Sequence, residues 1–131
     1  MKKSLRRGDY AALNIYFQYE LSEGNLGYAY HPTNTTSDSE EFYKDGCVIL
    51  FSTVPGGSAE DYNLGKTLTH EVGHWFGLDH TFEGGCDGEG DMVADTPASA
   101  SASEGCPKGR NSCPNNPGLD PIHNYMDYGY E

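Results

Sequence analysis

The side chains most capable of chemistry lie in one eleven-residue segment, residues 70–80. Its sequence is His-Glu-Val-Gly-His-Trp-Phe-Gly-Leu-Asp-His, an H-E-x-x-H-x-x-G-x-x-H pattern. On a helix, His70 and His74 lie one turn apart on the same face, so both imidazoles can reach one ion at about 2.0–2.1 Å. Gly77 can adopt the left-handed conformation that ends a helix, which lets the chain turn back and present His80 as a third ligand. The pattern therefore predicts a catalytic Zn²⁺ site, in which three histidines leave the fourth position for water.

Glu71 directly follows the first of these histidines, about 100° further round the helix, so its carboxylate can reach a water on the metal without displacing a ligand. The predicted reaction is amide hydrolysis. Zinc lowers the pKa of its water toward about 7 and polarises the scissile carbonyl, while Glu71 takes the water's proton and returns it to the leaving amine. A bare H-E-x-x-H pattern also arises in helices without catalytic function, but a glycine and a third histidine at fixed offsets make such a coincidence rare.

A helix over residues 64–76 is needed to position this segment. Asn63 is a suitable N-cap residue, and apolar side chains follow at helical spacing. These are Leu64, Leu68, Val72, Trp75 and Phe76. Two strands are predicted before the helix, over residues 12–21 and 46–54, and beyond Gly84 regular patterning stops.

Composition restricts the possible partners. The chain has 131 residues, which suits one domain, and 20 acidic against 8 basic residues give a formal charge of −12. Such a charge disfavours nucleic acids and anionic membranes as partners. No apolar run reaches the roughly 18 residues of a membrane span. The basic start of the chain resembles that of a signal peptide, but Gly8, Asp9 and Asn14 interrupt the apolar core such a peptide requires, so none is predicted.

The histidine motif resembles the signature of the metzincin metalloproteases. Residues 124–128, Asn-Tyr-Met-Asp-Tyr, resemble the metzincin Met-turn, in which a methionine packs beneath the zinc ligands. Further segments are similar to the pappalysin family (M43), especially its secreted fungal extracellular metalloproteases. They are residues 45–49, 80–82, 90–97 and 120–124. The resemblance extends over almost the whole chain and implies a secreted zinc metalloendopeptidase acting on protein or peptide substrates. A monomer is expected, although nothing in the sequence reports the oligomeric state.

The resemblance implies an α+β fold, a single metzincin-like catalytic domain over residues 1–131. A small twisted β-sheet and the active-site helix would form an N-terminal subdomain, residues 1–80. An irregular, disulfide-stapled subdomain with the Met-turn would follow over residues 81–131. Because family members carry further segments on both sides of this region, we expect the chain to be truncated at both ends and the domain to be incomplete.

Individual roles also follow from the resemblance. Met126 is expected as the Met-turn methionine, and Tyr128 as a tyrosine near the metal that could hydrogen-bond the tetrahedral intermediate. Cys86 is expected to pair with Cys113. An upper-rim strand, whose free edge would pair with an extended substrate, is expected at Cys47, Val48, Ile49 and Leu50. From composition alone that segment would be an ordinary buried strand.

Some residues remain open at this stage. Cys47 has no assigned partner, and the family partner of Cys106 lies beyond the Met-turn. An acidic glycine-rich loop could bind Ca²⁺ through Asp87, Glu89, Asp91 and Asp95, although a solvated acidic loop is the commoner outcome and the spacing is not that of an EF-hand. His31 is expected at the surface and His123 in a structural role.

Three other interpretations compete with the endopeptidase. A gluzincin would share H-E-x-x-H but take a glutamate from a later helix as third ligand, and Gly77 and His80 argue against it. A truncated, catalytically incompetent zinc-binding module would keep the metal without a complete substrate cleft. A chain of this size could also fail to fold in isolation.

Overall fold

The computed structural model describes residues 1–130, with residue 23 described for its backbone only. The chain forms two compact units, an N-terminal unit, Met1–Gly77, and a C-terminal unit, Leu78–Glu131. Glu131, the last residue of the predicted domain, lies outside the described residues. The predicted division into subdomains at residue 80 stays a prediction.

The N-terminal unit is built on a small three-stranded sheet. Its strands are β1 (Ile15–Gln18), β2 (Gly27–Tyr28) and β3 (Cys47–Leu50), in the spatial order β1-β3-β2. β1 runs parallel to β3, and β2 runs antiparallel to it. Both predicted strands are present but shorter than the sequence pattern indicates.

β3 is the central strand, which corrects one prediction. The strand Cys47–Leu50 was expected to offer a free edge to substrate, but it pairs with β1 on one side and β2 on the other. Its side chains also form the centre of the core, since Cys47, Val48 and Ile49 are 0%, 0% and 1% exposed. A strand whose backbone groups are paired on both sides cannot add a further strand, so this part of the substrate-binding prediction is wrong.

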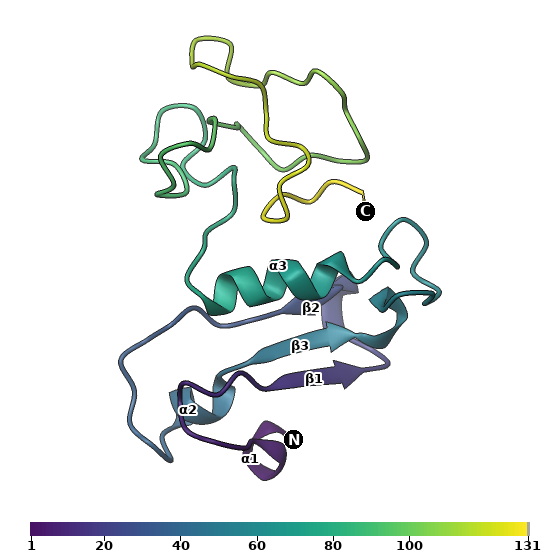
Figure 1. Ribbon diagram of the computed structural model, residues 1–131, viewed down its shortest axis with the longest axis vertical. Coiled ribbons are helices and arrows are strands. Elements are labelled where there is room, and N and C mark those ends of the chain that lie inside the picture. The colour runs from purple at the N-terminus through teal and green to yellow at the C-terminus, as the bar shows by residue number, and fades with distance from the viewer. Residues whose placement is uncertain (131) are drawn as a thin grey trace. The chain divides into compact units, whose positions relative to one another are not determined.

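Three helices accompany the sheet, one before β1, one between β2 and β3, and one after β3. They are α1 (Lys2–Leu5), α2 (Glu40–Lys44) and α3 (Lys66–Trp75), with 3₁₀ turns η1 (Ser22–Gly24) and η2 (Phe51–Thr53). α3 packs against β3 and β2 and lies across one face of the sheet (Figure 1). Among the described residues, no helix is long and apolar enough to cross a membrane.

α3 differs from its prediction at its start and in its buried face. It begins after Gly65, which has a φ of +88°, whereas the expected cap Asn63 donates its side-chain amide to the Gly57 carbonyl in the preceding loop. The most buried side chains of α3 are those of Thr67, Glu71 and His74. Of the predicted apolar stripe, two members are largely exposed, Leu64 and Phe76. The helix therefore turns polar, chemically active side chains inward.

The C-terminal unit has no helix or strand over residues 78–130. A disulfide joins Cys86 to Cys113, as the family resemblance implied. Arg110 forms an ion pair with the buried Asp120 at 3.0 Å. The prediction of an irregular, disulfide-stapled C-terminal region is confirmed.

Candidate metal centre

α3 places two histidines on one side of the helix. His70 and His74 are four residues apart, and their Nε2 atoms lie 3.0 Å from each other. Two nitrogens bound to one tetrahedral ion at about 2.0–2.1 Å would lie roughly 3.4 Å apart. The spacing of these two imidazoles therefore fits a shared metal ion.

The third histidine follows from the way α3 ends. Gly77 has a φ of +92° and donates its amide to the His74 carbonyl at 2.9 Å, so the helix stops and the chain turns there, as predicted. Within the segment from His70 to His80, one ring atom of each of the three histidines lies within 4.8 Å of the others. Three neutral imidazole donors are a common ligand set of catalytic zinc.

Contacts within the C-terminal unit hold His80. The hydroxyl oxygen of Tyr128 lies 3.0 Å from His80 Nε2. The Phe82 ring stacks on the imidazole, with centroids 4.8 Å apart and an interplanar angle of 9°. The next residue, Thr81, donates its backbone amide to the carbonyl of Met126, which is buried. The predicted Met-turn thus supports the segment that carries the third histidine.

Glu71 lies in a confined environment on α3. Its side chain is buried, and burial raises the pKa of Glu71 to about 7. β2 passes close to it, since a Cβ atom added to Gly27 would lie 2.9 Å from Glu71 Cγ. Glycine at position 27 therefore makes room for the carboxylate.

The Cys47 thiol on β3 is affected by the same surroundings. Burial, followed by the charge of Glu71, raises the pKa of the Cys47 thiol to about 12.

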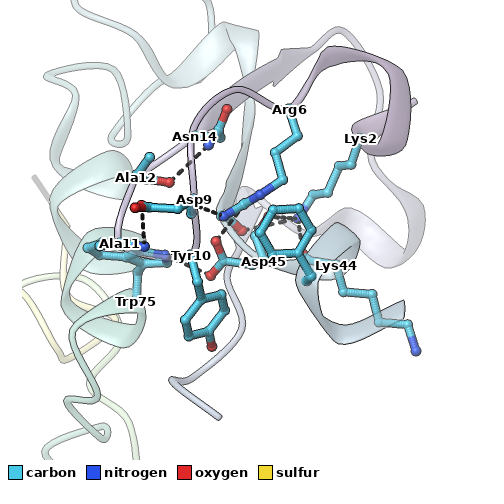
Figure 2. Close-up of polar contacts among 12 residues, drawn as sticks. Lys2, Arg6, Asp9, Tyr10, Ala11, Ala12, Asn14, Lys44, Asp45 and Trp75 are labelled. Carbon is cyan, nitrogen blue, oxygen red and sulfur yellow. Dashed lines mark hydrogen bonds and ion pairs between the residues drawn. The ribbon is translucent and has the colours of Figure 1, made fainter. Parts of the chain in front are cut away.

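A buried ion pair anchors the C-terminal end of α3 through Trp75 (Figure 2). Asp45, which lies just before β3, accepts a hydrogen bond from the Trp75 indole at 2.8 Å and pairs with the Arg6 guanidinium at 2.7 Å. Arg6 also donates to the Asp9 carbonyl and stacks over the Phe42 ring. Asp45 thus connects the N-terminal segment to the helix that carries two of the histidines.

His31 makes an unexpected contact with the site. It is exposed, as predicted, but its Nε2 lies 3.2 Å from His74 Nδ1, and the two rings stack with centroids 5.1 Å apart. Neither His31 nor Asp45 was expected to have a role in the site. Each contacts α3 from more than twenty-five residues away in the chain, so no local spacing pattern could have revealed it.

The acidic loop that contains Asp87, Glu89, Asp91 and Asp95 was considered as a Ca²⁺ site. Among the side chains that the structure describes, His70, His74 and His80 are the only group of three or more potential ligands that come together. Asp91 is buried and accepts a hydrogen bond from the Val93 amide, as a turn-forming carboxylate does. Calcium binding by the loop stays a prediction.

The four cysteines are in three different states. Cys86 and Cys113 are bonded, Cys47 is buried with a free thiol, and Cys106 is exposed with a free thiol.

The α+β architecture and the three-histidine group are those expected of the metzincin class. The family model of the M43 peptidases, described as pregnancy-associated plasma protein-A, matches residues 6–130. The chain therefore belongs to the M43 peptidase family.

Relatives and solved structures agree with this assignment. The chain is 63% identical to an extracellular metalloprotease of Colletotrichum graminicola and 64% identical to one of Neurospora crassa, in each case over 100% of this chain and 46% of the relative. Its fold is similar to that of Tannerella forsythia mature mirolysin in complex with a cleaved peptide. The TM-score is 0.76 and the identity 37%, over 91% of this chain and 45% of that chain. The chain thus spans about half the length of the relatives it matches.

Proposed function

We propose that this chain is a zinc-dependent metalloendopeptidase that hydrolyses peptide bonds of protein substrates. The observation that carries the proposal is the convergence of His70, His74 and His80, with Glu71 buried on the same helix. These three histidines would hold one zinc ion. Zinc supplies Lewis-acid chemistry when bound, because it acidifies water and polarises a carbonyl group.

Glu71 would act as the general base. Being adjacent to His70 on α3, it can take a proton from the attacking water and then deliver it to the leaving amine. The Glu71 carboxylate is buried and lies close to β2, since a Cβ atom added to Gly27 would lie 3.0 Å from Glu71 Oε1. A base held in one place needs less reorganisation during the reaction.

Tyr128 would stabilise the charge that develops on the substrate oxygen. Its hydroxyl oxygen lies 3.0 Å from the Nε2 atom of His80, so it is next to one of the three histidines that would hold the metal. A hydroxyl donor aimed at a developing oxyanion stabilises the transition state more than the ground state.

An extended peptide would pair with β2 rather than with β3. β2 is an edge strand of the sheet, and it is the strand that passes beside Glu71. Backbone hydrogen bonds to a sheet edge hold a peptide extended without selecting its side chains. The arrangement favours unfolded or flexible protein substrates.

The setting of this activity is proposed from the relatives. They are named extracellular metalloproteases, and we carry that location over to this chain, which also contains a disulfide. The net charge of −12 argues against nucleic acid and anionic membranes as partners. We further propose that the chain acts as a monomer.

The test is hydrolysis of casein, an unstructured protein, by the purified chain loaded with one equivalent of zinc. Glu71→Gln should retain zinc and lose nearly all activity, and a chelator should abolish cleavage. Substantial turnover by Glu71→Gln would exclude Glu71 as the base. A folded, zinc-loaded chain that cleaves nothing would instead support the alternative, a zinc-binding module without catalytic competence.

A further inference from the structure

The two ring nitrogens of His74 face different groups. Nε2 lies 3.0 Å from His70 Nε2, on the side where the three histidines converge. Nδ1 lies 3.2 Å from Nε2 of His31, and the two rings stack at an interplanar angle of 29°. If Nε2 binds a metal, the proton of the neutral His74 ring must be on Nδ1, where His31 is the neighbouring acceptor.

A hydrogen bond to the ring nitrogen that does not bind the metal affects how strongly a histidine binds the metal. A histidine that ligates a metal through one nitrogen almost always donates its other N–H to a fixed partner, which sets the tautomer and the direction of the ring. Loss of that partner typically lowers metal affinity by about 10–100-fold.

The chain segment that carries His31 is held in place by contacts of the next two residues, Pro32 and Thr33. The Thr33 amide donates to the Tyr10 hydroxyl at 2.9 Å. The ring of Pro32 lies 3.6 Å from the position that a Cβ atom on Gly77 would occupy, so this segment lies against the end of α3. His31 and Thr33 also line a cavity of about 160 Å³, with Tyr10 and Asp45 among its other walls. The cavity leaves room for solvent next to His31.

We propose that His31 is a positioning residue for the metal centre. It accepts the Nδ1–H hydrogen bond of His74 and thereby holds the imidazole with Nε2 directed at the metal. The inference rests on the proposed zinc site, and it assigns to His31 a role that the H-E-x-x-H-x-x-G-x-x-H motif does not include. His31 touches neither the substrate nor the reacting water; it acts through His74.

The experiment measures zinc affinity rather than turnover, by competition with a chromophoric chelator. His31→Phe keeps an aromatic ring to stack on His74 but removes the acceptor, and it should lower zinc affinity about 10–100-fold. His31→Gln supplies an amide oxygen near the position of the imidazole Nε2 and should restore most of the affinity. His123→Phe changes an exposed histidine outside the histidine group and is the matched control, expected to bind zinc as the unsubstituted chain does.

A second measurement addresses the geometry of the metal. The visible absorption bands of the Co²⁺-substituted chain should change in His31→Phe and not in His123→Phe. A purely structural role would instead lower the urea unfolding midpoint of His31→Phe and leave the Co²⁺ spectrum unchanged. Unaltered zinc affinity and an unaltered spectrum in His31→Phe would overturn the role of His31 while leaving the proposed peptidase intact. Failure of the unsubstituted chain to bind zinc would overturn both.

Discussion

The two units of the chain are stabilised in different ways. The N-terminal unit buries apolar side chains in a regular sheet and beside it, among them Tyr16, Phe42, Val48 and Ile49, and it buries polar side chains mostly outside the strands. The C-terminal unit, residues 78–130, has no regular element and buries mainly polar groups. They are Thr81, Asp91, Ser99, Ser103, Asp120 and Asp127, with Cys113 and Met126 as the apolar exceptions.

Hydrogen bonds between particular groups replace apolar packing in the C-terminal unit. The Asp127 carboxylate accepts from the Ser103 amide at 2.8 Å, and Asp120 accepts from the Ser112 amide at 2.9 Å. Arg110 donates to the Ser101 carbonyl. Each buried polar group is costly when its partner is lost, whereas an apolar contact is one of many. The N-terminal unit should therefore tolerate small changes in most places, and the C-terminal unit should depend on a few bonds.

The largest effect is expected at a buried ion pair of the N-terminal unit, Arg6–Asp45, where a small change should not be tolerated. Asp45→Asn leaves the Arg6 guanidinium buried without its counter-charge, which should cost about 3–5 kcal/mol of unfolding free energy. Urea denaturation measures this. Glu40→Gln removes the exposed Glu40–Lys44 ion pair and is the control, expected to leave the midpoint unchanged. An Asp45→Asn variant as stable as the control would show that apolar packing alone sustains the sheet and α3.

Removal of the disulfide should destabilise the C-terminal unit and leave the N-terminal unit nearly unchanged. Cys86 and Cys113 are 27 residues apart, and in the chain-entropy model a loop of that length gives roughly 3.5 kcal/mol of stabilisation. In the Cys86→Ala/Cys113→Ala variant, hydrogen exchange should accelerate over residues 78–130 and change little in β1 and β3. Cys106→Ala, at an exposed and unbonded cysteine, should leave exchange unaltered. Equal acceleration in both units would mean that they unfold as one cooperative body.

Acid should weaken the C-terminal unit through Asp120, with a smaller effect. Burial opposes ionisation, but hydrogen bonds from Ser112 and the Arg110 charge outweigh it and leave the pKa of Asp120 below its ordinary value. A carboxylate whose pKa is lowered in the folded state stabilises the fold at pH values above its unfolded pKa of about 3.9. This stabilisation is lost as the pH falls through the folded-state pKa. Asp120→Asn should therefore be less stable than the unsubstituted chain at pH 7, and the difference should shrink in acid.

Urea midpoints across this pH range, with the exposed Asp95→Asn as control, measure the effect. A difference that persisted unchanged to low pH would assign the loss to side-chain shape and not to the charge of Asp120.

The histidine motif and the central strand β3 were predicted from the sequence better than the segments that contact them. The spacing of His70, His74, Gly77 and His80 is local, and a helix with a left-handed end determines it almost completely. The strand containing Val48 and Ile49 was also evident from its apolar run. Its free edge was wrongly predicted because β2 is only two residues long, Gly27–Tyr28, and carries no strand pattern of its own.

The remaining differences concern one cap and two contacts between distant parts of the chain. The N-cap of α3 was assigned to Asn63 because its residue type is favourable, yet its amide bonds to a loop and Gly65 precedes the helix. The hydrogen bond from Trp75 to Asp45 spans 30 positions, and the His31–His74 contact spans 43. Tertiary packing creates such pairs, and neither periodicity nor spacing reports them.

The burial of Cys47 gives the chain an internal reporter of its own unfolding. With its pKa raised to about 12 by burial and its side chain 0% exposed, this thiol is shielded from alkylating reagents as long as the sheet is intact. Cys106 is exposed and unbonded, so it is open to the same reagents in the native state. Mass spectrometry after timed alkylation would therefore measure two rates. Labelling of Cys106 reports the activity of the reagent, and labelling of Cys47 reports the rate at which the sheet opens.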